Sequence, residues 1–167
     1  MKMETENNII FSFGTKFNYK NASLFVTLLI LPNLLGMINL PTSFGFKIHF
    51  FQLAVFIAAI LYGPVAGLLS GAIGSMYSAI VMHNPYIIVF NMLLGFLFGL
   101  FVRKKLNVFF AVWLAFLIEM PILVSIDHYL VNLPMKFIQP LLISLFISDT
   151  IWAVVAKYTA KAIEKVM

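Results

Sequence analysis

Long apolar stretches alternate with short polar breaks along most of this chain. Each stretch is close to the roughly 20 residues that a helix needs to cross the hydrocarbon of a bilayer. On this pattern we expect an all-α integral membrane protein with six transmembrane helices. The predicted helices span residues 22–40, 46–62, 64–82, 86–102, 107–130 and 136–157.

Turn-forming residues mark the breaks between the predicted helices. The Gly63-Pro64 pair is all that separates the second and third helices, so these two should form a tight antiparallel hairpin. The first stretch is the least regular, because Pro32, Asn33 and Gly36 interrupt it. An alternative with five helices omits this stretch or joins the second and third into one.

Composition supports the membrane assignment. The chain has 167 residues, of which 62% are hydrophobic and 10% charged, whereas globular domains have roughly 45–50% and 25%. We expect one membrane domain over residues 22–162, with short cytoplasmic tails at 1–21 and 163–167. The N-terminal stretch lacks the pattern of a removable signal peptide, and the absence of cysteine excludes disulfides and cysteine metal ligands.

The basic residues indicate an orientation. An even number of helices places both termini on one side, together with nine of the 11 Lys and Arg residues. Lys47 and Lys136 fall on the other side. This bias predicts cytoplasmic termini in a multi-pass protein of the cell membrane. It also accounts for the net charge of +5 without nucleic acid, because a cluster such as "VRKKL" suits acidic lipid head groups.

The third predicted helix carries two stripes of small residues at intervals of four. Gly63, Gly67, Gly71 and Ser75 form one stripe, and Ala66, Ser70, Gly74 and Ser78 form the other. In lipid, small residues allow helix backbones to approach closely. We therefore expect this helix to pack against neighbours on a broad face.

The same region carries a resemblance to a known family. The run from "FKIHFFQLAVFIAAILYGPVAGLLSGAIGSMYSAIVMHNP" into a helix with Gly95 and Gly99 and then a basic cluster resembles the substrate-binding S component of energy-coupling factor (ECF) transporters. The length, the six helices and the last helix that runs from "QPLLISLF" into a basic tail also fit. The resemblance covers about residues 24–165.

The resemblance implies a role in uptake and a set of partners. S components bind a vitamin, a vitamin precursor or a metal on the outer side, and they depend on a transmembrane coupling subunit and two ATPase subunits. This chain has no G-x-x-x-x-G-K-[ST] loop for ATP hydrolysis. The family often carries an Ala-x-x-x-Ala docking motif in its first helix, whereas here Ala22 is followed by Val26. The metal-transporting branch begins with a His motif that "MKMETENN" lacks, so we expect no metal and no cofactor.

Polar residues gather at the predicted outer ends of the helices. The substrate-binding candidates are Lys47, His49, Asn84, Asn91, Glu119, Asp127 and Gln139. Further polar residues there are Gln52, His83, His128 and Asn132. Asn91 lies within the fourth helix, where a polar group needs a partner, so it either bonds to a neighbouring helix or contacts a ligand. An apolar pocket with aromatic side chains would suit a flat heteroaromatic ring.

Two acidic residues lie deeper in the predicted helices, and no Lys or Arg accompanies them there. Intramembrane acids are costly and are functional candidates by default. Glu119 could contact a ligand amine or ring N–H, or could be a protonated carboxyl that stabilises the bundle. For Asp149, which the residue count places far from the outer face, we expect the structural role.

Enzymatic functions find no support in the sequence. The chain has no H-E-x-x-H metal motif and no G-x-S-x-G nucleophile elbow. A second function class stays open, because the rod-shape-determining membrane subunit of cell-wall synthesis has a similar length and glycine-rich hairpin and acts as a scaffold without ligand. A pocket at Asn91 and Glu119 would favour transport, and a filled core there would favour the scaffold.

Overall fold

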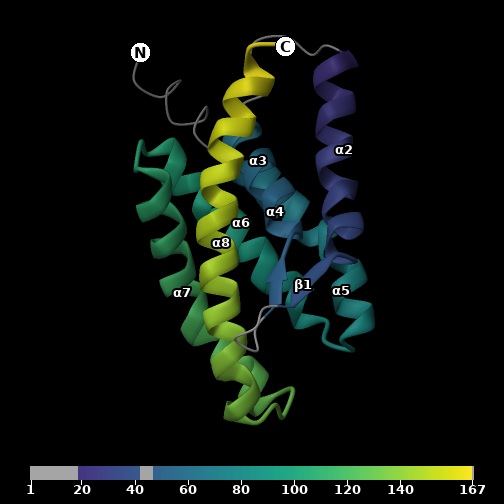
Figure 1. The fold of residues 1–167 in the computed structure, drawn as a ribbon, viewed down its shortest axis with the longest axis vertical. Coiled ribbons are helices and arrows are strands. Elements are labelled where there is room, and N and C mark those ends of the chain that lie inside the picture. The colour runs from purple at the N-terminus through teal and green to yellow at the C-terminus, as the bar shows by residue number, and fades with distance from the viewer. Residues whose placement is uncertain (1–18, 42–46, 167) are drawn as a thin grey trace.

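The computed structural model describes residues 19–41 and 47–166. Its elements are α2 (Tyr19–Gly36), β1 (Asn39–Pro41), β2 (Lys47–His49), α3 (Phe51–Tyr62), α4 (Pro64–Gly74), α5 (Met76–Val81), α6 (Tyr86–Arg103), α7 (Val108–Tyr129) and α8 (Met135–Glu164). The helices run in alternating directions, with α4 and α5 forming one interrupted rod (Figure 1). The start of α2 and the end of α8 consequently lie at the same end of the bundle. We call this the proximal end, and the opposite end distal.

Within the described residues, four helical rods are long and apolar enough to cross a membrane: Pro64–Val81, Tyr86–Arg103, Val108–Tyr129 and Met135–Glu164. Helix α3 is apolar but shorter. Together with α2, these rods occupy the six stretches expected from the sequence. The helical class is confirmed, and the crossing of the membrane by all six stays a prediction.

The chain departs from the expected helices between α2 and α3. The sequence predicted helix up to residue 40 and again from residue 46, but β1 and β2 pair here as antiparallel strands, with Leu40 opposite Ile48. Pro41 explains part of the difference, because proline disfavours helical geometry at the preceding residue and donates no hydrogen bond. A ribbon of two strands is marginal by itself, and α8 supports it. The backbone N–H of His49 donates to Ser148 Oγ at 3.3 Å, and the Trp152 indole donates to the His49 carbonyl.

The first small-residue stripe brings α4 and α6 into backbone contact. A Cβ atom added at Gly67 would collide with the Gly95 carbonyl oxygen, and one added at Gly71 would collide with the Asn91 carbonyl oxygen. Only glycine permits this approach. The expected packing role of this stripe is confirmed.

The second stripe faces a different neighbour, α2. Ser70 Oγ donates to the Leu28 carbonyl at 2.7 Å, and Gly74 lies so close to Pro32 that a Cβ atom would overlap with the proline ring. The rod of α4 and α5 is therefore fixed between α6 and α2, one stripe to each.

The hydrophobic core fills the proximal half of the bundle. Helix α3 runs through it, and its residues from Ala54 to Ala59 are at most 5% exposed. The Phe56 and Phe98 rings lie 4.4 Å apart between centroids. Near the proximal end, Arg103 Nη2 donates to the Leu61 carbonyl at 3.3 Å. Because this half is filled, space for a ligand has to lie in the distal half.

We predict that Gly67→Ala destabilises the protein by about 1–3 kcal/mol, the usual cost of overpacking, because the added methyl group forces α4 away from α6. Thermal unfolding of the purified protein in detergent measures the effect. Val89→Ile, which adds one methyl group to α6 at a position 49% exposed, is the matched control and should change stability little. Equal stability of the two variants would contradict the close α4–α6 contact.

Candidate functional site

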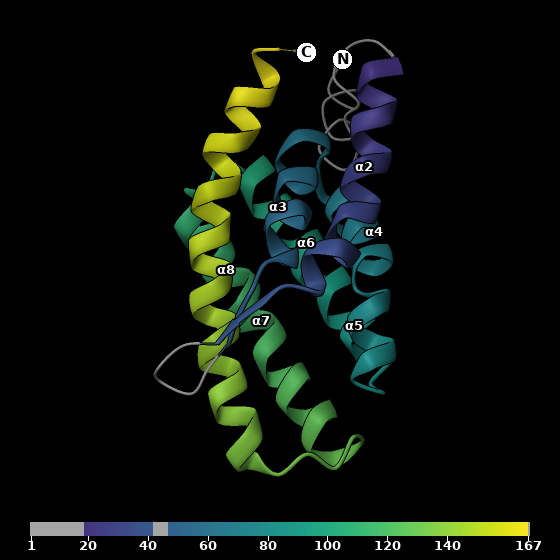
Figure 2. The ribbon, with the colours of Figure 1, turned by 45° about the vertical axis from the view of Figure 1, so that its right-hand side comes forward.

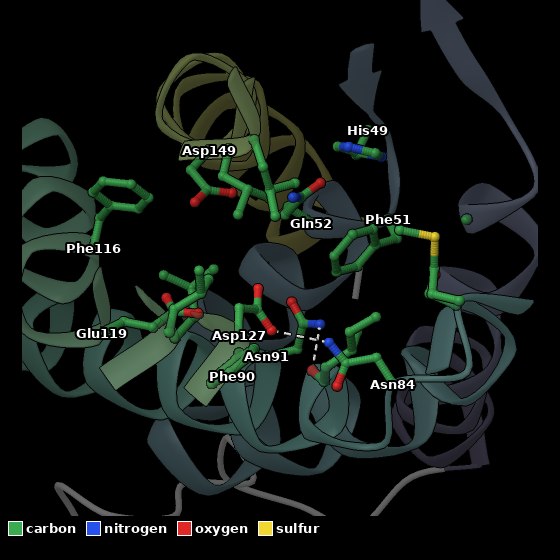
Figure 3. Close-up of a pocket in the computed structure, with 18 of the residues that line it drawn as sticks. His49, Phe51, Gln52, Asn84, Phe90, Asn91, Phe116, Glu119, Asp127 and Asp149 are labelled. Carbon is green, nitrogen blue, oxygen red and sulfur yellow. Dashed lines mark hydrogen bonds between the residues drawn. The ribbon is translucent and has the colours of Figure 1, made fainter. Parts of the chain in front are cut away.

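A cavity of about 200 Å³ lies in the distal half of the bundle. Residues of β2, α3, α5, α6, α7 and α8 line it, together with the end of α2 and the α5–α6 and α7–α8 turns (Figure 3). Much of its wall is apolar and aromatic, including Phe51, Phe90, Phe116, Leu94 and Leu123. A few polar side chains also face the cavity.

The cavity brings together five of the seven candidates named from the sequence: His49, Asn84, Asn91, Glu119 and Asp127. They come from four separate parts of the chain. Gln139 is exposed on α8 and is not part of the lining. Lys47 belongs to β2, and its side chain lies outside the described part of the structure.

Asn84 and Asp127 join the α5–α6 turn to the last turn of α7. Asn84 Nδ2 donates to Asp127 Oδ1 at 3.0 Å, and the Tyr86 N–H donates to Asn84 Oδ1 at 3.1 Å. Asn84 is 6% exposed and Asp127 3% exposed. The Asp127 carbonyl also accepts from the Leu133 N–H at 2.8 Å. These bonds hold the α5–α6 and α7–α8 turns together at the distal end of the cavity.

Asn91 lines the cavity from α6. Its Nδ2 donates to the Ile87 carbonyl, one turn earlier in the same helix, at 2.8 Å. The side chain is 7% exposed. The sequence left two roles open for Asn91, a bond to a neighbouring helix or contact with a ligand. The Nδ2 group makes no bond to a neighbouring helix, because it donates within α6.

Two further polar residues face the cavity, and both are almost completely buried. Gln52 of α3 is 1% exposed and Asp149 of α8 is 2% exposed. Both amide atoms of Gln52 and Oδ1 of Asp149 are buried without a hydrogen-bond partner among the described residues. Gln52 and Asp149 lie near each other in Figure 3, and the Gln52 amide is close enough to interact with the Asp149 carboxyl, although their atoms do not meet the full geometry of a hydrogen bond. Buried polar groups are usually paired, so these three atoms are unusual.

Sequence reasoning missed Asp149 as a cavity residue because it measured depth along α8 from the start of that helix. The hairpin of α7 and α8 extends beyond the other helices at the distal end (Figure 2). The middle of α8 therefore lies beside β2, where Ser148 accepts the bond from His49. Gln52 did carry a signal, since it is an isolated amide at the start of the apolar helix α3.

The cavity is rich in carboxyl groups and poor in bases. Glu119 is 4% exposed on α7, and its carboxyl points into the cavity, as does that of Asp149 (Figure 3). Among the described lining residues there is no Lys or Arg. The described part of the chain contains no group of three or more His, Cys, Asp or Glu residues that could hold a metal ion. The arrangement can bind a small molecule through hydrogen-bond acceptors set in an apolar wall.

Comparison with known proteins identifies the family. The chain matches the family described as "ECF transporter, substrate-specific component" over residues 21–165. No curated protein and no solved structure matches the chain. The family is a transporter component and not an enzyme family.

The match extends over nearly all of the described helices and includes every residue that lines the cavity. It agrees with the apolar helices, with the packing stripes and with a cavity whose apolar wall carries a few polar groups. The chain belongs to the family of substrate-specific components of ECF transporters and is a substrate-binding membrane subunit.

Proposed function

We propose that this subunit captures a vitamin or vitamin precursor in the distal cavity, on the outer face of the membrane, for ATP-driven uptake. The observation that carries the proposal is the set of unpartnered polar atoms on Gln52 and Asp149. In an apolar bundle an unsatisfied polar group costs several kcal/mol. A bound ligand that supplies hydrogen bonds would remove this cost.

The dimensions of the cavity favour a small ligand. Its volume of about 200 Å³ is below the roughly 300–1,000 Å³ of typical ligand pockets. Phe51, Phe90 and Phe116 supply aromatic surfaces. A flat heteroaromatic compound of one or two rings fits these features, and its recognition is assigned to His49, Asn84, Asn91, Glu119 and Asp127 with Gln52 and Asp149. Lys47 and Gln139 are proposed only as residues of the rim.

The proposed orientation has six membrane spans within residues 22–162 and both tails in the cytoplasm. Support comes from the basic residues of the described chain: Lys20, Arg103, Lys104, Lys105, Lys157, Lys161 and Lys165 lie toward the proximal end. Lys136 lies at the distal end, where α8 begins. By the positive-inside rule, this distribution supports a cytoplasmic proximal end and a cavity that faces outward.

The proposed partners are a transmembrane coupling subunit and two ATPase subunits, which the family relationship supports. Such partners would dock without a complete Ala-x-x-x-Ala motif in α2, because Val26 follows Ala22 and is 51% exposed.

We predict that the purified wild-type protein carries a small molecule that mass spectrometry detects after denaturation. Asn91→Ala and Glu119→Ala should reduce the bound amount roughly tenfold or more, since a hydrogen bond to a ligand contributes about 1–3 kcal/mol. Ser125→Ala, on an exposed face of α7, is the control and should retain the ligand. If the wild type and the three variants retain equal amounts of ligand, the ligand binds outside this cavity. If no ligand is recovered with any vitamin supplied, the proposed function is refuted.

The orientation can be tested by single cysteines, because the natural chain has none. We predict that Lys136→Cys reacts with a membrane-impermeant maleimide on intact cells, whereas Lys104→Cys reacts only after the membrane is permeabilised. Both positions are exposed in the structure, so access to reagent depends on the membrane alone. The reverse labelling pattern would invert the proposed topology.

A further inference from the structure

Most of the titratable side chains that line the cavity are acidic. Glu119, Asp127 and Asp149 line it with side chains at most 4% exposed. His49 is the one basic residue among the described lining residues. A buried charge without a partner is costly, so such carboxyl groups are neutral unless a positive charge comes close. No Lys or Arg lies among the described lining residues to supply that charge, whereas a cationic ligand could supply it.

The three carboxyl groups differ in their bonding. Asp127 already accepts a hydrogen bond from Asn84 and belongs to the connection between the two distal turns. Asp149 Oδ1 has no partner among the described residues, and no described group donates a hydrogen bond to Glu119. Glu119 and Asp149 lie on the two facing helices α7 and α8, and both point into the space between them (Figure 3).

Gln52 supplies a separate observation that points to a ligand. It enters the cavity from α3, is 1% exposed, and leaves both Nε2 and Oε1 unpartnered among the described residues. An amide offers a donor and an acceptor together. A ligand that contacts the Gln52 amide would also lie near Asp149, and its other edge would face Glu119 (Figure 3).

We propose that the cavity selects a small organic cation with N–H donors, which the carboxyl groups of Glu119 and Asp149 hold while the Gln52 amide binds its polar edge. This inference rests on the proposed function and names the substrate class for the same cavity. An amino- or amidino-substituted ring has the required chemistry, because its planar N–H groups match carboxylate oxygens and its ring packs on the aromatic wall.

A metal ion is a poorer occupant of this cavity than an organic cation. The described residues contain no group of three or more His, Cys, Asp and Glu side chains arranged to hold a metal. The lining also includes Phe51, Phe90 and Phe116, which offer a surface for a ring and no ligand for a metal.

The test uses three probes of the same shape and different charge: benzamidine, benzamide and benzoate. Each has one ring and one planar head group, and they carry a positive, no and a negative charge at neutral pH. Binding to the full chain in detergent is measured from the rise in unfolding temperature with probe concentration. We expect benzamidine to bind about tenfold or more tighter than benzamide, because hydrogen bonds between charged groups are the stronger ones, and benzoate to bind weakest.

Variants then assign the selectivity to the two carboxyl groups. Glu119→Gln and Asp149→Asn preserve shape and remove a charge, and each should weaken benzamidine about tenfold while leaving benzamide within about threefold. If one variant does not fold, the other carries the comparison. Glu164→Gln, exposed at the proximal end of α8, is the matched control and should leave the order of the probes unchanged.

Several outcomes overturn the proposal. They are benzoate or benzamide binding as tightly as benzamidine, an unchanged preference in both carboxyl variants, or no binding of any probe. These outcomes do not decide the proposed function, which depends on the compound recovered from the wild-type protein. A neutral or anionic compound that is retained by wild type and lost in Asn91→Ala would preserve the function and refute the cation.

Discussion

The close contact between α4 and α6 is the constraint on which the rest of this structure depends. Lipid provides no hydrophobic force between helices, so packing at short range has to hold the bundle together. At Gly67 and Gly95 the two backbones meet with no room for a side chain. This contact fixes the rod of α4 and α5 against α6, and α3 packs into the proximal half around Phe56 and Phe98. The cavity is the distal space that this arrangement leaves unfilled.

The distribution of hydrogen bonds separates structural polar groups from those available to a ligand. Where the rod is interrupted at Ser75, Asn33 of α2 donates to the Ile73 carbonyl at 2.7 Å and accepts from the Tyr77 N–H at 2.9 Å. This one side chain satisfies both backbone groups at the break, which sets Tyr77 against the cavity. Where β2 meets α8, Ser148 and Trp152 satisfy the backbone of His49 in the same way. Against this background, the polar atoms of Gln52 and Asp149 differ, because they face the cavity and lack a complete hydrogen bond among the described residues.

Binding and energy supply are divided between subunits in this family, and the structure suits that division. The chain supplies a bundle with a filled proximal core and a distal cavity, both within residues that match the substrate-specific component. The tight α4–α6 and α2–α4 contacts make the bundle a firm support for the cavity, because neither interface has space for a side chain to be added. Side chains from widely separated parts of the chain then hold positions that a small molecule can contact together.

The sequence by itself determined the features that follow from local pattern. Apolar length predicted the helices, spacing of small residues predicted which helix would pack most closely, and the isolated polar residues predicted five members of the cavity. Tertiary structure alone decided the β1–β2 ribbon, which depends on bonds from α8, and the place of Asp149. A residue count gives depth only within one helix, whereas the relative height of helices depends on how they pack. The α7–α8 hairpin extends past its neighbours. The Asp149 carboxyl, which the residue count placed far from the outer face, therefore lines the cavity together with Gln52 and His49.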